Sequence, residues 1–293
     1  MKKRVAAFIA IALLLVFAGV IAFTSPPKLL SVIDGFAGGG SGTQRAGTAV
    51  AFGKHGQTLD VWRPAEQSAK QRPVIVFFHG GGWVKGDRDA YAFVGRAFAS
   101  RGYTVVIPDY RKVPDVRFPA FIEDGAEAVR WTRDNIAQFG GDPDRIALAG
   151  HSAGAHPAVT LALDPRWLTA AGVEPGAIKA AIGLSGPYDF YPFDKKRSID
   201  AMSQWPEPRD TQPIAFARAD APPMLLVTSS KDTVVRPYNT ENLTAKLREL
   251  GAPVESENYE GLSHEEVVMA LSKAFRGKAP VLDRSVTFLK QAM

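Results

Sequence analysis

The sequence predicts an α/β fold built as a doubly wound, mostly parallel sheet flanked by helices. Short apolar runs bounded by Gly, Pro or Asp recur along the chain, and such runs are typical of strands buried on both faces of a parallel sheet. Amphipathic stretches of helical length separate these runs, which indicates βαβ units. The chain of 293 residues is 46% hydrophobic, enough for the core of one large domain.

The elements follow from this alternation. The predicted strands comprise residues 74–78, 104–107, 146–149, 180–184, 224–228 and 254–259. The predicted helices comprise residues 88–101, 120–139, 153–163 and 238–250. Gly102 and Gly251 follow two of these helices, in the position where glycine commonly ends a helix. Residues 186–222 interrupt the pattern; they are rich in Pro and aromatic residues and predict a short, irregular, lid-like insertion over the sheet.

Residues 1–25 are expected to be a targeting segment. Three basic residues precede an unbroken apolar run at residues 5–23, which as a helix would be roughly 28 Å long, close to the thickness of a bilayer core. This length favours an uncleaved signal anchor, whereas the small residues Val20 and Ala22 suit a signal peptide cleaved after Ala22. Either alternative predicts a protein of the cell envelope, outside the cytoplasm, membrane-anchored or secreted to the periplasm.

Residues 26–47 are expected to form a flexible, glycine-rich tether. Two prolines end the apolar run, and residues 35–47 are dominated by Gly and small polar residues. The folded catalytic domain is then expected to comprise residues 48–293, including the insertion at 186–222.

Composition excludes several classes of protein. The chain has no cysteine, which excludes a disulfide scaffold, a thiol nucleophile and a cysteine metal site. The net charge is +5, and three of these charges precede the apolar run, which leaves only +2 for the rest of the chain. So small an excess does not suggest a nucleic-acid partner.

A G-x-S-x-G motif, GHSAG at residues 150–154, directly follows the predicted strand 146–149. Glycines are needed in such a strand-to-helix turn because side chains would clash, while the serine is held exposed at the turn. A lone match to this motif is weak evidence for a nucleophilic serine, but the predicted strand before it and the predicted helix after it strengthen that evidence. Ser152 is therefore the candidate nucleophile.

A second glycine motif, HGGGW at residues 79–83, ends the predicted strand 74–78. Consecutive glycines let a backbone approach a ligand closely and turn its N–H groups toward a developing oxyanion. The predicted donors are Gly81 and Gly82, with the N–H of Ala153 as a third.

The general base must be one of five histidines. His55 precedes the core strands, His79 belongs to the glycine loop, and His151 and His156 flank the serine without pointing at its substrate side. His264 lies in a loop after the last predicted strand, and it follows both nucleophile and acid in chain order, as this type of triad requires. His264 is therefore the predicted base.

The acid is expected just after the strand 224–228. Asp232 lies there, where it would orient the imidazole of His264 and stabilise its protonated form. Asp220 is the alternative, but it precedes the strand and so belongs to the opposite end of the sheet. Ser152, Asp232 and His264 should then meet at the carboxyl edge of parallel strands.

The HGGGW motif, Asp109-Tyr-Arg111 and GHSAG together resemble the hormone-sensitive-lipase and bacterial carboxylesterase branch of the α/β hydrolases, from about residue 59 to the C-terminus. The resemblance implies an α/β-hydrolase fold and an esterase with the triad and oxyanion donors named above. His151 replaces the Asp often found before the nucleophile, as in smaller capless esterases and formamidase-like hydrolases. Residues 24–47 are also too few to build the N-terminal cap of larger relatives.

Aromatic residues are the candidates for substrate contacts. Trp83 follows the oxyanion loop, and Tyr188 is one of the aromatic residues in the insertion that could line the pocket from above. Asp109, Arg111 and Asp124 are expected to form a polar network that holds loops rather than to catalyse.

The sequence therefore predicts a serine hydrolase that cleaves short-chain carboxylic esters through an acyl-enzyme, with a small-molecule ester as partner and no cofactor or metal. An amidase, formamidase or peptidase would use the same machinery. A transacylase would pass the acyl group to another alcohol instead of water, and a non-catalytic binding module would lack one of the triad residues. Membrane association depends on an uncleaved N-terminus. No feature of the sequence specifies an oligomeric state.

Overall fold

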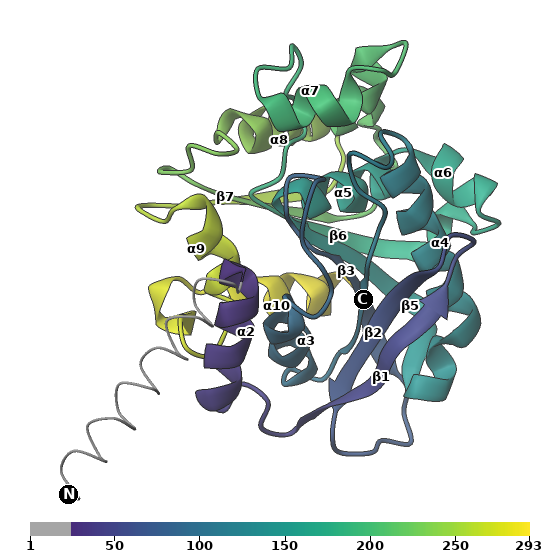
Figure 1. The fold of residues 1–293 in the computed structure, drawn as a ribbon, viewed down its shortest axis with the longest axis vertical. Helices are drawn as coiled ribbons and strands as arrows, with labels where there is room; N and C mark the ends of the chain where they lie inside the picture. Colours follow the sequence, from purple (N-terminus) through teal and green to yellow (C-terminus); the bar gives the residue numbers. More distant parts are fainter. Residues whose placement is uncertain (1–24) are drawn as a thin grey trace, which may run out of the picture.

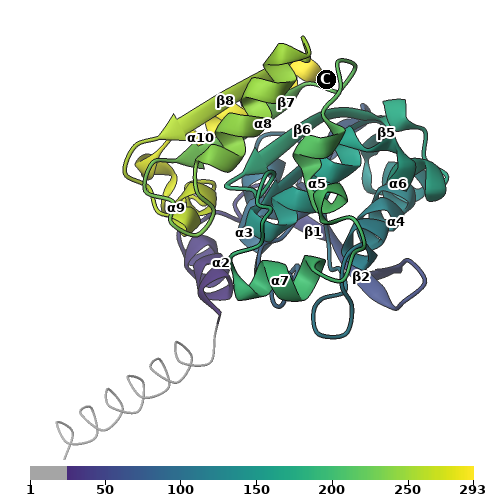
Figure 2. The ribbon, with the colours of Figure 1, turned by 90° about the horizontal axis from the view of Figure 1, so that it is seen from above.

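The computed structural model describes residues 25–293, which form an eight-stranded sheet with helices on both faces (Figures 1 and 2). The predicted targeting segment thus lies outside the described residues, apart from Ser25. The strands are β1 (Thr43–Phe52), β2 (Gln57–Pro64), β3 (Arg72–Phe78), β4 (Thr104–Pro108), β5 (Gly141–His151), β6 (Ile178–Leu184), β7 (Met224–Ser229) and β8 (Val254–Tyr259).

The strand order is β1-β2-β4-β3-β5-β6-β7-β8. The six strands from β3 onward pair in parallel, whereas β2 pairs antiparallel with both β1 and β4. All six predicted strands are present, and the doubly wound, mostly parallel sheet is confirmed. The antiparallel strands β1 and β2 were not predicted individually.

The helices are α2 (Pro26–Phe36), α3 (Ala92–Ala99), α4 (Ala120–Asn135), α5 (Ala155–Leu163), α6 (Pro165–Ala170), α7 (Lys196–Met202), α8 (Tyr238–Glu249), α9 (His264–Met269) and α10 (Val281–Ala292). Among residues 25–293, none of them combines the length and the apolar character that a membrane span requires.

The core lies on both faces of the sheet because successive strand residues point to opposite sides. Ile75 and Phe77 of β3 pack in the cluster that includes residues of α3 and α10. Val74, Val76 and Phe78 belong to the opposite cluster, with residues of α4 and α5. This two-sided burial explains why the central strands are continuous apolar runs rather than alternating ones.

Residues 26–47 are not a flexible tether. They contain α2, which packs on α3 (Figure 1), and β1 begins at Thr43. Asp34 of α2 is 1% exposed and accepts a hydrogen bond from Nε of Arg96 at 2.8 Å. Proline at the first helical positions starts a helix, and Leu30 gives it an apolar contact with the core. The folded domain therefore begins at about residue 26.

The insertion at residues 186–222 is irregular, as predicted, and contains the short helix α7. Figure 2 shows α7 at the end of the domain where the carboxyl ends of the parallel strands lie. Its aromatic side chains Phe190, Phe193 and Trp205 pack against the core cluster that also contains Trp83. The insertion is therefore held to the domain by apolar contacts.

Candidate active site

The three residues of the predicted triad lie at the carboxyl edge of neighbouring parallel strands. Ser152 follows β5, Asp232 follows β7, and His264 follows β8 as the first residue of α9. In an open α/β sheet this edge is where ligands bind. Asp220, the alternative acid, lies before β7 at the opposite edge and pairs with Arg218 at 2.8 Å.

A strained turn presents the serine. Ser152 has φ = +55°, in the left-handed region that non-glycine residues rarely occupy. A Cβ atom at Gly150 would lie 2.2 Å from the carbonyl oxygen of Gly154, and one at Gly154 would lie 2.2 Å from that of Phe78. Both glycines are therefore required by the close approach of backbone, as expected for a nucleophile elbow.

Two hydrogen bonds link the three side chains. The Ser152 hydroxyl lies 2.7 Å from Nε2 of His264, and Nδ1 of His264 lies 2.7 Å from Oδ2 of Asp232. The other carboxylate oxygen of Asp232 accepts the backbone N–H groups of Val234 at 3.0 Å and Val235 at 2.8 Å. The aspartate is thus fixed on both sides, and the neutral imidazole carries its proton on Nδ1, leaving Nε2 free to accept one from serine.

His151, which the sequence analysis placed away from the substrate side of Ser152, contacts the backbone of His264. Its Nε2 lies 3.3 Å from the backbone carbonyl of His264, and its Nδ1 lies 3.1 Å from the Tyr91 hydroxyl. Burial, with the neighbouring His264, lowers the pKa of His151 well below its usual value. A neutral ring at this position holds the His264 backbone without adding a charge beside the base.

The remaining histidines have structural roles. His79 is fully buried; its Nδ1 lies 2.9 Å from the carbonyl of Gly80 and its ring stacks on Tyr110. His156 is also fully buried, and its Nε2 contacts the Thr211 carbonyl at 2.7 Å. His55 lies on an exposed turn.

The glycine loop faces the same cleft. Gly81 has φ = +138° and Gly82 has φ = +63°, and a Cβ atom at Gly81 would lie 2.0 Å from the Lys85 carbonyl oxygen. Within residues 25–293, neither glycine N–H donates a hydrogen bond. Ala153, the third predicted donor, is buried beside Ser152 and lines the cleft with both glycines. The N–H groups of Gly81 and Gly82 are therefore available to an incoming oxygen atom.

The cleft has a volume of about 460 Å³ and is lined by Ser152, His264, the glycine loop and part of the insertion. Trp83 lines it as predicted, with its ring 5.9 Å from that of Phe190. Tyr188 does not line the cleft, and the prediction that it contacts the substrate is wrong. Its side chain is fully buried in the core cluster with Leu226, and its backbone N–H donates to the Asn239 side chain at 3.0 Å.

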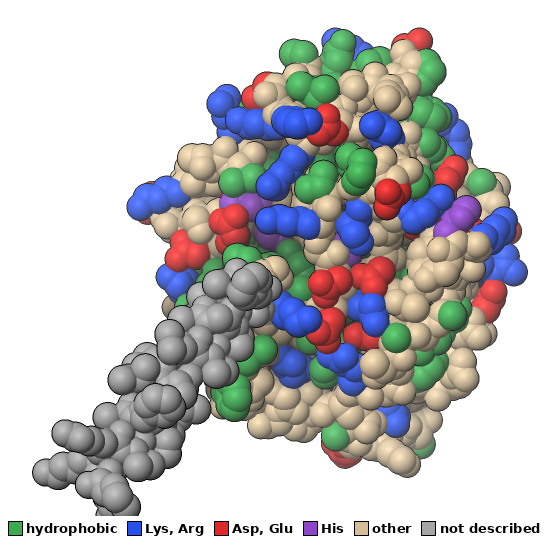
Figure 3. Space-filling view, in the orientation of Figure 1, with side chains coloured by type: hydrophobic (Ala, Val, Ile, Leu, Met, Phe, Trp, Pro, Cys, Tyr) green, Lys and Arg blue, Asp and Glu red, His purple; other side chains and the backbone are tan. Residues whose placement is uncertain are grey.

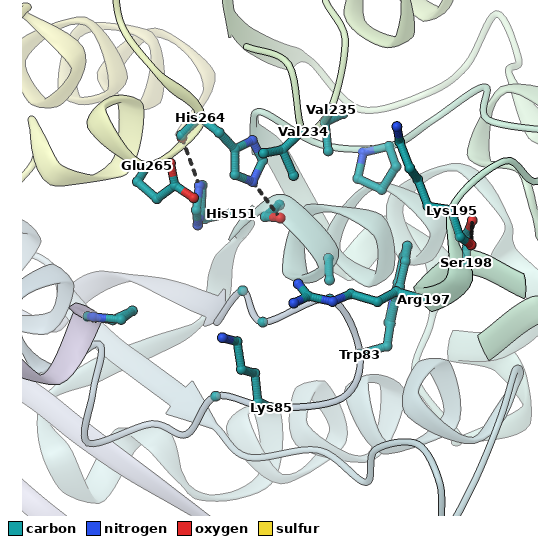
Figure 4. Close-up of a pocket in the computed structure, with 18 of the residues that line it drawn as sticks. Trp83, Lys85, His151, Lys195, Arg197, Ser198, Val234, Val235, His264 and Glu265 are labelled. Carbon is teal, nitrogen blue, oxygen red and sulfur yellow. Dashed lines mark hydrogen bonds between the residues drawn. The ribbon is translucent and has the colours of Figure 1, made fainter. Parts of the chain in front are cut away.

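Sequence reasoning missed several residues that line the cleft. Lys85, Arg197 and Glu265 contribute side chains to it, and Figure 4 shows Arg197 and Lys85 pointing into the cavity. Ser25, Pro26 and Pro27 line it too, from the start of α2. No local signal marks these residues, because isolated charges and an N-terminal proline pair are common on any surface.

The predicted polar network lies beneath the glycine loop. Arg111 pairs with Asp124 at 2.7 Å, and Asp109 receives the Arg88 backbone N–H at 2.8 Å. Burial alone would raise the pKa of Asp109, but the His79 ring, 3.6 Å from its carboxylate, and the hydrogen bonds from Arg88 lower it to about 2. The network therefore holds the glycine loop in place and is not a substrate-binding site.

No group of three His, Cys, Asp or Glu side chains within residues 25–293 is arranged to hold a metal ion.

The sequence matches the BD-FAE family model over residues 59–247. Esterase LipC of Mycobacterium tuberculosis is 34% identical over 66% of this chain and 52% of that protein. The isoprenylcysteine alpha-carbonyl methylesterase of Arabidopsis thaliana is 29% identical over 72% of this chain and 54% of its own length. The chain thus spans about half the length of these relatives.

Two solved structures share the fold. Thermogutta terrifontis esterase 2 in its apo form has a TM-score of 0.70 and 23% identity, covering 86% of this chain and 95% of that one. The Pyrobaculum calidifontis esterase has a TM-score of 0.71 and 22% identity, covering 90% and 91%. Because the family model matches more than half of the chain and these folds superpose, this protein belongs to the BD-FAE family and has the α/β-hydrolase fold.

Proposed function

We propose that this protein is a serine hydrolase that cleaves small carboxylic esters. The observation that carries the proposal is the continuous hydrogen-bonded line from Ser152 through His264 to Asp232 at the wall of a 460 Å³ cleft. The esterases among its relatives and structural neighbours support the same chemistry.

The reaction would proceed in two steps. Ser152 Oγ attacks the ester carbonyl while His264 Nε2 takes its proton, and Asp232 stabilises the imidazolium that forms. The protonated His264 then gives its proton to the departing alcohol. Water attacks the acyl-enzyme in the second step, with His264 again acting as base, and the acid is released.

The developing oxyanion would be bound by backbone N–H groups of Gly81, Gly82 and Ala153. The amides of Gly81 and Gly82, which donate no hydrogen bond within residues 25–293, support this role. Donors that are fixed before reaction stabilise the transition state without reorganisation, and each typically contributes about 3 kcal/mol.

Short acyl groups fit this cleft best. The aromatic rings around Trp83 pack on one another, with Phe190 at 5.9 Å and Phe190 in turn 5.7 Å from Phe193. Rings in contact with one another fill space instead of leaving a tunnel for a long chain. Since each buried methylene contributes about 0.8 kcal/mol, a chain that cannot be enclosed gains little from added length.

The test is the rate profile over p-nitrophenyl esters of increasing acyl length, with a p-nitroanilide and an aryl formamide of the same acyl size. We expect kcat/KM to peak at or below about eight acyl carbons and to be much lower for the amides. A higher rate on the anilide or formamide would instead identify an amidase or formamidase. Faster cleavage of long-chain emulsified triglycerides would refute the short-chain preference.

We also propose that residues 1–23 direct the protein to the cell envelope. The basic start and the apolar run at residues 5–23 support this. Ser25–Pro27 line the cleft, so an uncleaved anchor would hold the cleft next to the membrane surface. Cell fractionation with N-terminal sequencing of the recovered protein distinguishes an anchor from a cleaved signal, and recovery in the cytosol would contradict both.

A further inference from the structure

The cleft carries more positive than negative side chains. Its lining includes the cations Lys85, Lys195, Arg197 and Arg236 but only the carboxylates Asp194 and Glu265. Lys and Arg side chains are also prominent beside the partly visible histidines on this face of the molecule (Figure 3). The proposed ester reaction itself requires none of these cations.

Arg197 lies against the proposed oxyanion loop. A Cβ atom built at Gly82 would lie 2.6 Å from its Cδ and 2.9 Å from its Nη1. The guanidinium group is therefore within reach of a substituent on any ester whose carbonyl oxygen is bound by the Gly82 amide. Figure 4 shows this side chain extending into the cavity from α7.

The neighbours of Arg197 are neutralised locally, and Arg197 is not. Lys196 pairs with Asp200 at 2.7 Å, and Lys195 lies 3.8 Å from Asp194. Within residues 25–293, Arg197 forms no ion pair with a carboxylate. The difference arises because its side chain turns into the cleft, whereas Lys196 is paired along the outer surface of the helix.

Lys85 enters the cleft from another element. Its backbone N–H donates a hydrogen bond to the Gly81 carbonyl at 3.2 Å, which holds the residue beside the glycine loop, while its side chain points into the cavity (Figure 4). Lys85 also has no carboxylate partner among the residues that the structure describes. Glu265 is a carboxylate of the lining that forms no ion pair with the residues that the structure describes, and Figure 4 shows it beside His151 rather than between the two cations.

We propose that Arg197 and Lys85 bind an anionic group, a carboxylate or a phosphate, on the ester substrate. This inference rests on the proposed esterase function and names its substrate class. A planar guanidinium binds such anions with two parallel hydrogen bonds, and a nearby ammonium group adds a second positive charge. Two unneutralised cations repel each other in the empty cleft, and an anion removes that repulsion on binding.

The anion has two possible sources, a charge on a soluble ester and the headgroup of an anionic lipid. The first arm compares para-acetoxybenzoate with para-acetoxybenzamide, which differ in charge but little in size. A second soluble pair, the p-nitrophenyl monoester of adipic acid and p-nitrophenyl hexanoate, places the charge on the acyl side. The lipid arm measures hydrolysis of neutral p-nitrophenyl butyrate with vesicles of phosphatidylglycerol or phosphatidylcholine added.

We expect the wild-type protein to prefer the charged member of at least one soluble pair by roughly tenfold in kcat/KM. Arg197→Gln should reduce that preference about tenfold, and Lys85→Gln by a smaller factor of about three. High salt should reduce the preference in the same direction because it screens exposed charges. Lys196→Gln, one residue away on the same helix and outside the cleft, is the matched control and should leave the preference unchanged.

The outcomes separate this inference from the proposed function. If the protein cleaves neutral esters but shows neither a charge preference nor an inhibition by phosphatidylglycerol vesicles that depends on Arg197, the anion site is refuted and the esterase stands. Inhibition by phosphatidylglycerol vesicles alone, lost in Arg197→Gln, supports the site and identifies a lipid headgroup as the source. If wild type and control cleave no ester of either charge, the esterase proposal itself fails. The inference would also be overturned if Arg197→Gln and Lys196→Gln reduced the preference for the charged ester equally.

Discussion

Nε2 of His264 lies 2.7 Å from Oγ of Ser152, although the two residues are 112 positions apart in the chain. The contact forms because β5 and β8 end at the same edge of the sheet and the segment after each strand turns toward the other. Asp232 reaches the same imidazole from the loop after β7. The sheet therefore aligns three side chains that come from separate segments of the chain.

Ser152→Ala should reduce ester hydrolysis by more than about 10³-fold and abolish labelling by a fluorophosphonate probe. The fold should survive, because the elbow depends on Gly150 and Gly154 rather than on the hydroxyl. The check combines initial rates, gel-based labelling and the thermal midpoint Tm. Substantial labelling of the variant would show that another residue is the nucleophile.

His264→Ala should be about as damaging as the serine change, because the two residues act as one unit. Asp232→Asn should retain more activity, roughly 10- to 100-fold above His264→Ala, since the aspartate only orients and stabilises the imidazole. His156→Gln serves as the control, because it removes a buried histidine that contacts Thr211 instead of Ser152. Loss of turnover in a folded His156→Gln protein, with His264→Ala still active, would reverse the assignment of the base.

The two loop glycines should respond differently to alanine. At Gly82 the backbone is left-handed, with φ = +63°, but the atoms nearest to a new methyl group belong to the flexible Arg197 side chain. Gly82→Ala should therefore fold with a small loss of Tm and lower kcat by roughly 10²-fold with little change in KM. At Gly81 the methyl group would also lie 2.0 Å from the Lys85 carbonyl oxygen, so Gly81→Ala should lower Tm more. Steady-state kinetics and differential scanning fluorimetry separate the two effects. A change confined to KM would mean that the loop only shapes the pocket.

The stability of the protein should fall as the pH drops from about 6.5 to about 4. Burial lowers the pKa of His156 from its usual 6.5 to about 4. Between these values the unfolded chain binds a proton that the folded protein excludes, so protons favour unfolding. The loss from this group is on the order of 3 kcal/mol across that interval, and buried His151 changes stability in the same direction.

Urea unfolding of His156→Gln between pH 4 and pH 7 tests this point. The glutamine amide can still donate to the Thr211 carbonyl but cannot be protonated, so the free energy of unfolding should depend less on pH than in the wild type. If the free energy of unfolding of the variant depends on pH as strongly as that of the wild type, groups other than His156 cause the pH dependence.

Asp34→Ala should destabilise the protein strongly, by about 3 kcal/mol, because it leaves the buried guanidinium of Arg96 without its carboxylate. Asp134→Ala is the matched control, since its pair with Arg130 is exposed on α4 and such pairs contribute about 0.5 kcal/mol or less. Chemical unfolding of both variants gives the comparison. Equal small losses would mean that α2 is not an integral part of the fold.

Local sequence determined the features that depend on neighbouring residues. The central strands could be predicted because a strand covered on both faces must be apolar throughout, as in β3. Ser152 could be predicted because the elbow turn excludes side chains at Gly150 and Gly154. His264 followed from chain order, which itself reflects the order of strands in the sheet.

Only the tertiary structure decided which side chains share the cleft. Tyr188 and Trp83 look alike as aromatic residues near the site, but packing directs the first into the core and the second to the cleft wall. Arg197 and Lys196 are adjacent cations, and only the orientation of α7 turns one inward. Asp34 lies in a glycine-rich stretch whose composition suggests a tether, yet its buried ion pair with Arg96 fixes a helix there. Side-chain direction depends on contacts between segments far apart in the chain, and no local pattern encodes those contacts.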